Sequence, residues 1–334
     1  MKPVLKVTKI GPAVTVQDAG WQGTLAMGLS RGGVADTLAY AQIGALLGLD
    51  NTAVLEMAGI GGAFHALQDT RIALAGAQMD ARLDGTALLW NGVHRVSKGQ
   101  VLEIGAARSG MYGYLGIGGG FSTPRFQGSA STHRGAGLGH VVQADDVLEG
   151  NDDSKPDRVG LALPNVSIAN SAVRVVATSH SDLFDEECRN LFETTVFTRG
   201  TRGNRQGVTL DATTSFALKG GQSLPSETVI PGDIQVPGEG APYALLADSQ
   251  TTGGYPRIAA ILPCDLPRIA QAVAGDTLRF KFISREEGIA AELAERKARA
   301  KLTSLCKPIL RDPTQMQDLL SYQLISGAIS GEPE

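Results

Sequence analysis

The chain has 334 residues, 43% of them hydrophobic and 19% charged, and its 30 basic and 34 acidic side chains give a net charge of -4 at pH 7. This length predicts about two domains of roughly 150 residues each, and the composition excludes a mostly disordered chain. The slight acidic excess argues against nucleic acid or an anionic membrane surface as a partner. No run of about 18 apolar residues predicts a membrane span, and the first residues lack the apolar core of a signal peptide. We therefore expect a cytoplasmic protein.

Short alternating or branched runs dominate the sequence, and each is bounded by Gly, Pro, Asn or Asp, as strands and their turns are. In chain order the predicted strands are 4–10, 71–75, 101–104, 111–117, 173–177, 194–198, 243–247, 257–262 and 277–283. Because no regular strand, helix, strand rhythm occurs, we expect a mainly β protein whose antiparallel strands form barrels or sandwiches.

Helices are predicted in four places. An amphipathic segment at 34–47 stops at Gly48, and a second helix follows Asp265, where Pro267 fits the first turn. Ser284 and Glu287 form a capping-box pattern that predicts a helix to about residue 302. Beyond it, residues 314–325 are expected to form a short helix that packs on the core or on another subunit.

The polar string GNDDSKPDR at 150–158 has the composition of a linker. We therefore predict a first β-barrel domain at 1–155, a second at 156–283 and a helical tail at 284–334.

Several common sites are excluded by their missing motifs. Three scattered cysteines and five histidines show no disulfide or zinc spacing, so we expect no metal. The Gly-rich strings at 59–64, 116–121 and 135–140 do not match GxGxxG, and GxxxxGK[ST] does not occur. We interpret these strings as turns and strand ends, or alternatively as backbone nests for an anion.

Small polar residues gather at two bends. The first is TVQDAG at 15–20, and the second is ADSQTTGGYPRIA at 247–259, preceded by GDIQVPGEGAP at 232–242. Polar side chains beside Gly turns can converge on a small ligand without a metal. We predict that the two bends face one shared hollow. Arg257 is either a cation for a carboxylate or phosphate, or a surface charge at the start of a strand.

These strings resemble the biotin-dependent carboxyltransferase family, which includes the C subunit of bacterial 5-oxoprolinase, allophanate hydrolase subunit 2 and the carboxyltransferase domain of urea carboxylase. The resemblance runs from TVQDAG through the Leu55-Glu56 pair and the GGGF and GSAST strings, is densest at 231–280, and covers the tail after Ser284 least. It implies two cyclophilin-like antiparallel β-barrel domains, a few short helices and a C-terminal helical tail. It also implies a small polar substrate and a partner subunit of similar fold.

The first functional hypothesis from this resemblance is a subunit of an ATP-dependent amide or lactam hydrolase of the 5-oxoprolinase type. It would act with a second subunit of the B type and with a lactam-utilising companion, and ATP would activate the lactam before water opens the ring. The proposed catalytic residues are Asp18 and Gln17. The proposed substrate contacts are Gln250, Thr251, Thr252 and Arg257, with Gln235 and Glu56 behind them.

Two alternatives stay open. The first is a carboxyltransferase component that uses biotin carried by another protein, because this chain has no MKM biotin-attachment string. The second is a non-catalytic regulatory binding protein, which is motivated by departures from the family pattern. The family usually has Arg at the positions of Trp21, Tyr112, Ala130 and His140. It usually has Ser at the position of Gly32, Asn at that of Gly44, and Ser-Asp at that of Gly200-Thr201.

Overall fold

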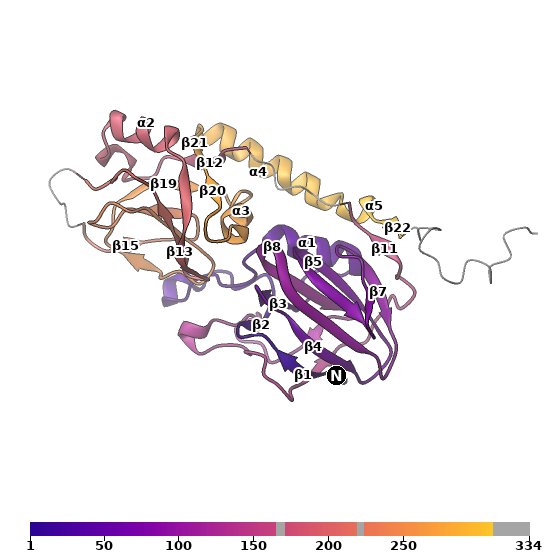
Figure 1. Cartoon of the computed structure of the whole chain (residues 1–334). Coiled ribbons are helices and arrows are strands. Elements are labelled where there is room, and N and C mark those ends of the chain that lie inside the picture. Colours follow the sequence, from indigo (N-terminus) through magenta and orange to yellow (C-terminus); the bar gives the residue numbers. More distant parts are fainter. Residues whose placement is uncertain (165–170, 219–223, 310–334) are drawn as a thin grey trace, which may run out of the picture.

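A computed structural model describes residues 1–164, 171–218 and 224–309 (Figure 1). These residues form a mainly β structure with two curled sheets and few helices, which confirms the predicted fold class at this level. The first sheet contains β1 (Lys2–Ile10), β2 (Val14–Gln17), β3 (Val54–Ala58), β4 (Gly62–Ala66), β5 (Thr70–Leu83), β6 (Thr86–Ala87), β7 (Val93–Val96), β8 (Val101–Ile117), β9 (Phe121–Ser122) and β10 (Val147–Gly150). The second contains β12 (Val173–Val176), β13 (Phe197–Asn204), β14 (Gly207–Asp211), β16 (Asp233–Gln235), β17 (Tyr243–Leu245), β19 (Arg257–Ile261), β20 (Thr277–Leu278) and β21 (Phe280–Phe282).

Two short ribbons lie outside these sheets. One pairs β11 (Leu161–Ala162) with β22 (Lys307–Pro308), and the other pairs β15 (Glu227–Thr228) with β18 (Thr252–Gly253). The α-helices are α1 (Thr37–Leu47), α2 (Glu186–Thr194), α3 (Leu266–Gln271), α4 (Arg285–Ala300) and α5 (Leu302–Leu305), and the 3-10 turns are η1 (Thr24–Met27), η2 (Arg134–Ala136) and η3 (Ser181–Leu183). None of the helices in the described ranges is long and apolar enough to cross a membrane.

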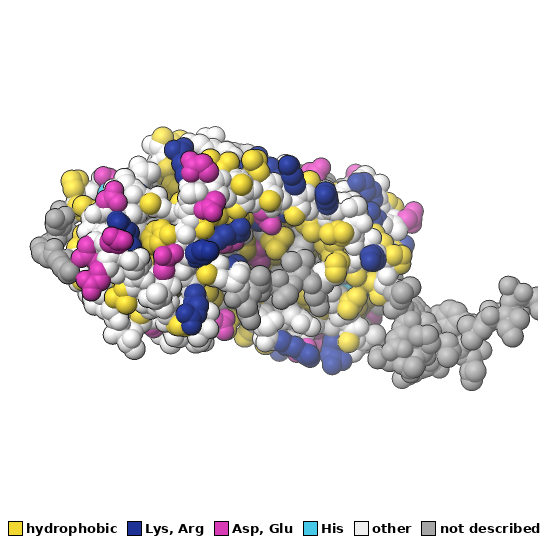
Figure 2. Space-filling view, turned by 90° about the horizontal axis from the view of Figure 1, so that it is seen from above, with side chains coloured by type: hydrophobic (Ala, Val, Ile, Leu, Met, Phe, Trp, Pro, Cys, Tyr) yellow, Lys and Arg dark blue, Asp and Glu magenta, His cyan; other side chains and the backbone are white. Residues whose placement is uncertain are grey.

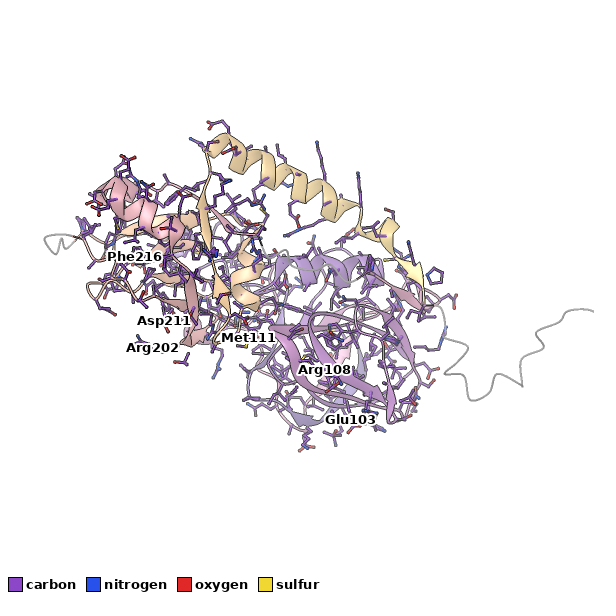
Figure 3. All side chains as sticks on the ribbon, turned by 45° about the horizontal axis from the view of Figure 1, so that its top comes forward. Glu103, Arg108, Met111, Arg202, Asp211 and Phe216 are labelled. Atoms are coloured by element: carbon purple, nitrogen blue, oxygen red, sulfur yellow. The ribbon has the colours of Figure 1, made fainter. Side chains whose placement is uncertain are left out.

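The long strand β8 organises the first sheet. It pairs with β5 along its length on one edge, and on the other edge with β4 near its start and β3 near its end. The predicted strands at 101–104 and 111–117 are therefore parts of one strand. Gly110 has a φ of +80°, and register shifts between Gly76 and Ala81 bend the pair without ending it. β8 belongs to the first sheet over its whole length. In Figure 3, the labelled residues Glu103 and Met111 show that the strand runs toward the second sheet between these two positions.

The second sheet closes on itself through residues 277–282. In this stretch β20 pairs with β13 and β21 pairs with β12, at opposite ends of the strand order, and only Arg279 separates the two. Phe192 of α2 fills one end of the interior, with its ring centroid 5.0 Å from that of Phe197 and 5.1 Å from that of Phe280. The predicted strand at 194–198 begins only at Phe197, because α2 occupies the residues before it.

Local signals mark the ends of two predicted helices. Helix α1 stops at Gly48 as predicted, where the φ is +64°, but it begins at Thr37 rather than at residue 34, because the Asp36 side chain accepts hydrogen bonds from the N–H groups of Leu38 and Ala39 and caps it there. Helix α4 begins with the predicted capping box of Ser284 and Glu287. The predicted helix at 314–325 lies outside the described residues.

Helix α3 follows Asp265 as predicted, with Pro267 in its first turn. The Asp265 side chain makes no cap hydrogen bond and instead accepts two from the Arg174 guanidinium, at 2.6 and 2.9 Å. This bidentate ion pair holds the start of α3 against β12.

The predicted linker at 150–158 is anchored to the first sheet and α1, because Asp153 pairs with the buried Arg71 of β5 and Arg158 donates to the last carbonyls of α1.

Other contacts fix the two sheets to each other. Helix α4 packs on β12 and reaches α1, where Arg299 donates to Thr37 at 3.0 Å. The face over α4 carries interspersed acidic, basic and apolar side chains (Figure 2). One cluster of buried hydrophobic side chains lies within the first sheet, whereas the other extends from α1 into the interior of the second sheet. The predicted domain boundaries themselves stay predictions.

Candidate functional site

The first predicted bend follows β2 and is wrapped by the GSAST string. The buried Asp18 carboxylate accepts hydrogen bonds from the Ser129 hydroxyl (2.5 Å), the Ser131 hydroxyl (2.6 Å), the Ala130 N–H (2.8 Å), the Gly20 N–H (2.9 Å) and Arg125 (3.2 Å). Both carboxylate oxygens are therefore engaged, and Asp18 holds residues 128–132 in place. A catalytic role for Asp18 stays a prediction.

Gln17 is fully buried beside Asp18. Its side-chain N–H₂ group donates to the Thr15 hydroxyl and the Thr132 carbonyl, at 3.1 and 3.0 Å. Its Oε1 atom has no hydrogen-bond partner among the described residues. A buried polar atom without a partner is rare and costs about 1–3 kcal/mol, so this oxygen lacks the hydrogen bond that a water or ligand would supply.

The second predicted bend covers Gln235, which lies on β16. Gln235 is 2% exposed, its Oε1 accepts from Gln250 at 3.4 Å, and its Nε2 has no partner within the described part of the chain. Gly253 of β18 lies directly against this amide, because a Cβ there would come within 2.5 Å of Gln235 Nε2. The hydroxyl of Ser249, in the same bend, is also buried without a described partner.

Arg257 lies beside Gln235 on the neighbouring strand β19, with its side chain 11% exposed. Its guanidinium donates to Glu227 at 2.8 Å, to the Thr228 carbonyl and Ser179 at 3.1 Å, and to Asp233 at 3.4 Å. Burial raises the pKa of Asp233, which Arg257 partly offsets. Since protein groups already surround the guanidinium, Arg257 fastens the β15–β18 ribbon to the second sheet.

Glu56 lies in a buried ion cluster at the junction of the sheets. Its carboxylate accepts hydrogen bonds from the Ala35 N–H and the Tyr114 hydroxyl, both at 2.7 Å, and from Arg205 of the second sheet. Arg205 also forms a bidentate pair with Asp248, with both contacts at 2.8 Å. Burial and the adjacent Glu56 charge raise the pKa of Tyr114 well above its usual value, so its hydroxyl stays a donor.

Gln271 of α3 forms a second tie at this junction. Its Oε1 accepts from the backbone N–H groups of Met111 and Tyr112, and its Nε2 donates to Asp36 and the Tyr112 carbonyl, with distances of 2.8–2.9 Å. Neither Arg205 nor Gln271 was identified as functional from the sequence. Long-range pairing alone gives them their roles, and no local motif marks such pairing.

The two predicted bends are connected through residues 31–34. The Val34 N–H donates to the Asp18 carbonyl and the Gly32 N–H donates to the Ala247 carbonyl, each at 3.0 Å. Gln235, Gln250 and Arg257 lie beside the β15–β18 ribbon, which itself contains Thr252, and Gln17 and Asp18 lie on the other side of this connection. Thr251 joins the ribbon through its carbonyl, which accepts from the Val229 N–H at 3.0 Å. A single hollow shared by both bends stays a prediction.

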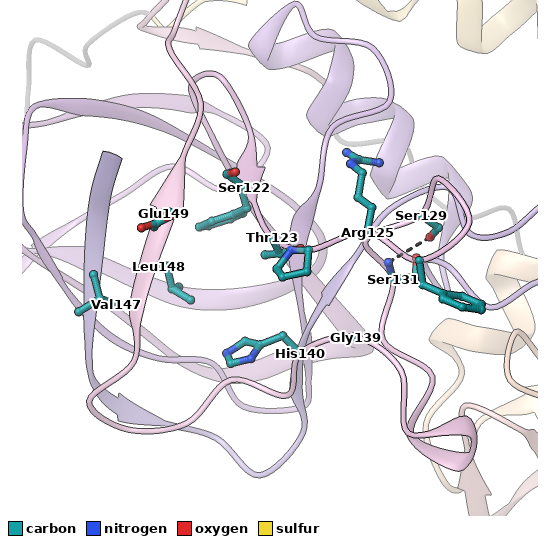
Figure 4. Close-up of a pocket in the computed structure, with 13 residues that line it drawn as sticks. Ser122, Thr123, Arg125, Ser129, Ser131, Gly139, His140, Val147, Leu148 and Glu149 are labelled. Atoms are coloured by element: carbon teal, nitrogen blue, oxygen red, sulfur yellow. Dashed lines mark hydrogen bonds between the residues drawn. The ribbon is translucent and has the colours of Figure 1, made fainter. Parts of the chain in front are cut away.

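A cavity of about 410 Å³ lies next to the first bend (Figure 4). Ser129 and Ser131 line it and place Asp18 behind its wall, while His140, Leu148 and Glu149 form other parts of the lining. In the described ranges, the residues of the second bend are not part of this lining. No three His, Cys, Asp or Glu side chains in those same ranges group closely enough to hold a metal ion.

Two departures from the family pattern are physically linked. Trp21 is buried and donates from its ring N–H to the Phe126 carbonyl at 2.8 Å. At Gly32, which has a φ of +56°, a Cβ would come within 2.6 Å of the Trp21 ring. The large ring at position 21 therefore needs a residue without a side chain at position 32.

Comparison with known proteins places the chain in a family. Residues 27–282 match the family described as carboxyltransferase domain, subdomain A and B. The chain belongs to this family. It is 31% identical over 291 residues to the C subunit of 5-oxoprolinase from Haemophilus influenzae and 32% identical over 300 residues to that of Escherichia coli K12, covering 93% and 94% of those proteins and 85% and 86% of this chain.

Other similar proteins are larger than this chain. Urea amidolyase of Saccharomyces cerevisiae is 27% identical over 308 residues, which cover 84% of this chain and 17% of that protein. Among solved structures, TTHA0988 is 30% identical with a TM-score of 0.75, over 84% of this chain and 55% of that one. Urea amidolyase of K. lactis has a TM-score of 0.82 at 21% identity, over 94% of this chain and 21% of that one, and supports the fold alone. The chain thus spans about half or less of these solved chains.

Proposed function

We propose that this protein is one subunit of an ATP-dependent lactam hydrolase of the 5-oxoprolinase type. The observation that carries the proposal is the match to two 5-oxoprolinase C subunits over 93% and 94% of their lengths. The word subunit in their names supports a complex, and we propose a second subunit of the same family as the partner, together with a lactam-utilising companion. Two cyclophilin-like barrels and a cytoplasmic location belong to the same proposal.

In the proposed reaction, the lactam oxygen takes the γ-phosphoryl group of ATP and ADP leaves. Water then adds to the ring carbon, and the ring C–N bond breaks with its electron pair on nitrogen, which takes a proton, so that an acyl phosphate forms. A second water attacks the carbonyl carbon of this acyl phosphate, the C–O bond to phosphate breaks, and glutamate and phosphate are released. Shielding the activated lactam from other water favours this outcome. Because the sequence has no GxxxxGK[ST] loop, we propose that the nucleotide is held largely by the partner.

The proposal assigns substrate contacts to Gln250, Thr251 and Thr252, with Gln235 and Glu56 behind them. Arg257 is assigned a positioning role, because its guanidinium is already surrounded by five protein acceptors. Gln17 and Asp18 are assigned to the catalytic side of the site. The unpartnered oxygen of Gln17 supports this assignment, since it can accept from a lactam N–H or a water.

The test is ADP release by the chain purified with its candidate partner. We expect 5-oxoproline to stimulate ADP release with one glutamate formed per ADP. Gln250→Ala should lower kcat/KM about tenfold, as expected for the loss of one hydrogen bond, whereas the exposed Gln78→Ala should not. ADP release that no lactam stimulates would refute the hydrolase proposal.

A carboxyltransferase that uses biotin on another protein is the second candidate. The family description and the relationship to urea amidolyase favour it. It predicts carboxylation that avidin abolishes, and insensitivity to avidin rules it out. A regulatory binding protein is the third candidate, favoured by the Trp21–Gly32 substitution pair. It predicts tight association with a partner and no turnover, and turnover in a reconstituted complex excludes it.

A further inference from the structure

The cavity beside the first bend has an inner side made of core residues and an open mouth. Phe121 and Leu148 line it from the inside; they are 2% and 5% exposed and belong to the cluster of buried hydrophobic side chains in the first sheet. Val147 and Glu149 line it from the outside, where Val147 is 50% exposed and Glu149 is exposed as well. Because the side chains of β10 alternate between its two faces, the cavity connects the solvent with the edge of this core.

The lining of this cavity carries an unbalanced negative charge. The Glu149 carboxylate has no hydrogen-bond or ion-pair partner among the described residues. The other charged groups of the lining are paired. Arg125 donates to Asp18 at 3.2 Å, and the His140 Nε2 atom lies 2.7 Å from the Asp146 carboxylate. Protonation of His140 can at most neutralise Asp146, so the net charge of these groups stays negative in either state.

This charge selects the sign of a ligand. An anion in the cavity would be repelled by Glu149 and would lose part of its hydration without gaining a free cation. Arg125 does not supply that cation, because it already donates to Asp18. In Figure 4 its side chain extends away from His140 and Leu148. A cation, in contrast, can keep its charge at the mouth beside Glu149 and bury an apolar body against the inner wall.

We propose that the cavity is a binding site for a small organic cation, an amine whose apolar ring packs on Phe121 and Leu148 and whose ammonium group donates to Glu149. Ser122 lies directly opposite Glu149 in the β9–β10 pair, so its hydroxyl can accept a second hydrogen bond from the same ammonium group. The cavity volume of about 410 Å³ is in the range of small-molecule sites, roughly 300–1,000 Å³. This site is independent of the proposed hydrolase, because the acid group makes 5-oxoproline an anion at neutral pH.

NMR on the full ¹³C-labelled chain tests this site through the methyl signals of Val147 at the mouth. These signals are assigned by their loss in Val147→Thr. Benzylammonium, benzyl alcohol and benzoate share one ring and differ in charge, whereas methylammonium has the cation without the ring. We expect benzylammonium to shift the Val147 signals, benzyl alcohol to bind more weakly, and benzoate and methylammonium to leave the signals unchanged. Val196, which is 42% exposed and lies outside this lining, is the reference and should not respond to any probe.

Two variants test the charge of Glu149. Glu149→Gln keeps the shape and removes the charge, so it should weaken benzylammonium binding about fivefold and leave the binding of benzyl alcohol unchanged. Glu149→Lys should abolish benzylammonium binding and allow benzoate to bind. Glu103→Gln is the matched control, because Glu103 is an exposed glutamate of the first sheet outside this lining, and it should bind benzylammonium normally. Since both glutamates are exposed, each variant should keep the wild-type melting temperature, which verifies that its fold is intact.

Three results would each overturn this site. The first is that benzylammonium at high millimolar concentration leaves the Val147 signals unmoved. The second is that Glu149→Gln binds benzylammonium as tightly as the wild type does. The third is that benzoate moves the Val147 signals as much as benzylammonium does. Lactam-stimulated ADP release enters none of these measurements, so the cation site and the hydrolase are decided separately.

Discussion

Replacing Arg205 by Met tests how the two sheets are held together. Arg205 bridges Glu56 of the first sheet and Asp248 of the second, and its side chain is only 13% exposed. The two carboxylates it serves are themselves 1% and 6% exposed as residues. Methionine has a similar length but provides neither charge nor donors, so both carboxylates would remain buried without their cation.

The expected loss of stability follows from that burial. Removing one partner from a buried ion pair commonly costs about 3–5 kcal/mol, because the remaining charge is uncompensated. Glu56 keeps its hydrogen bonds from Ala35 and Tyr114, which limits its share of the cost. We therefore expect Arg205→Met to lower the free energy of unfolding by about 3–5 kcal/mol in total.

Urea unfolding, followed by the fluorescence of Trp21 and Trp90, measures this change. Arg108→Met is the matched control, because Arg108 pairs with Asp80 on the surface and its side chain is 66% exposed. Its loss should be below about 1 kcal/mol. Adding Glu56→Gln and Asp248→Asn to Arg205→Met removes the stranded charges and should recover much of the stability. A loss below about 1 kcal/mol for Arg205→Met would refute the reasoning.

Three further predictions concern single sites. Gln271→Ala removes four hydrogen bonds at the junction and leaves two backbone donors and the Asp36 carboxylate without these partners. Burial already raises the pKa of Asp36. The free energy of unfolding, measured in urea, should fall by about 3 kcal/mol, and a change under about 1 kcal/mol contradicts this prediction. Burial, with the neighbouring Glu292 charge, raises the pKa of Cys264 to about 12. At pH 8 the Cys264 thiol should therefore react with a disulfide reagent about 30-fold more slowly than an ordinary thiol, after allowing for the greater nucleophilicity of its thiolate. A reaction rate equal to that of an ordinary thiol, measured by mass spectrometry, would show that the pKa of Cys264 is not raised. Gly32→Ala should lower the free energy of unfolding by about 2 kcal/mol, and by clearly less when Trp21→Leu is also present. A double-mutant cycle that shows no coupling between positions 21 and 32 argues against the contact between them.

The sequence predicts the elements that carry local signals. The stop at Gly48 and the capping box at Ser284 each act within a few residues, and both mark real helix ends. Strand β8 was predicted as two pieces because Gly105 and Gly110 interrupt its pattern, whereas pairing with β5 carries the strand through them. Pairing partners far away in the chain decide such cases, and a local pattern does not contain them.

The same distinction applies to the candidate site. Turn chemistry pointed to the bends at Gln17 and Gln250, which lie on two sides of residues 31–34. It could not indicate that Asp18 is wrapped by a string 111–113 residues away, or that Arg257 is occupied by its neighbours. A side chain's partners across the fold determine whether it is available to a ligand.

The pairing of β11 with β22 has a consequence for how the protein is made. Residues 161–162 remain an open strand edge until residues 307–308 have left the ribosome, because only then can the ribbon form. Synthesis at about 5–20 residues per second leaves that edge exposed for several seconds or more. Unpaired edges favour association with other nascent chains, so yield in cells should depend on chaperone capacity more than the stability of the finished protein suggests.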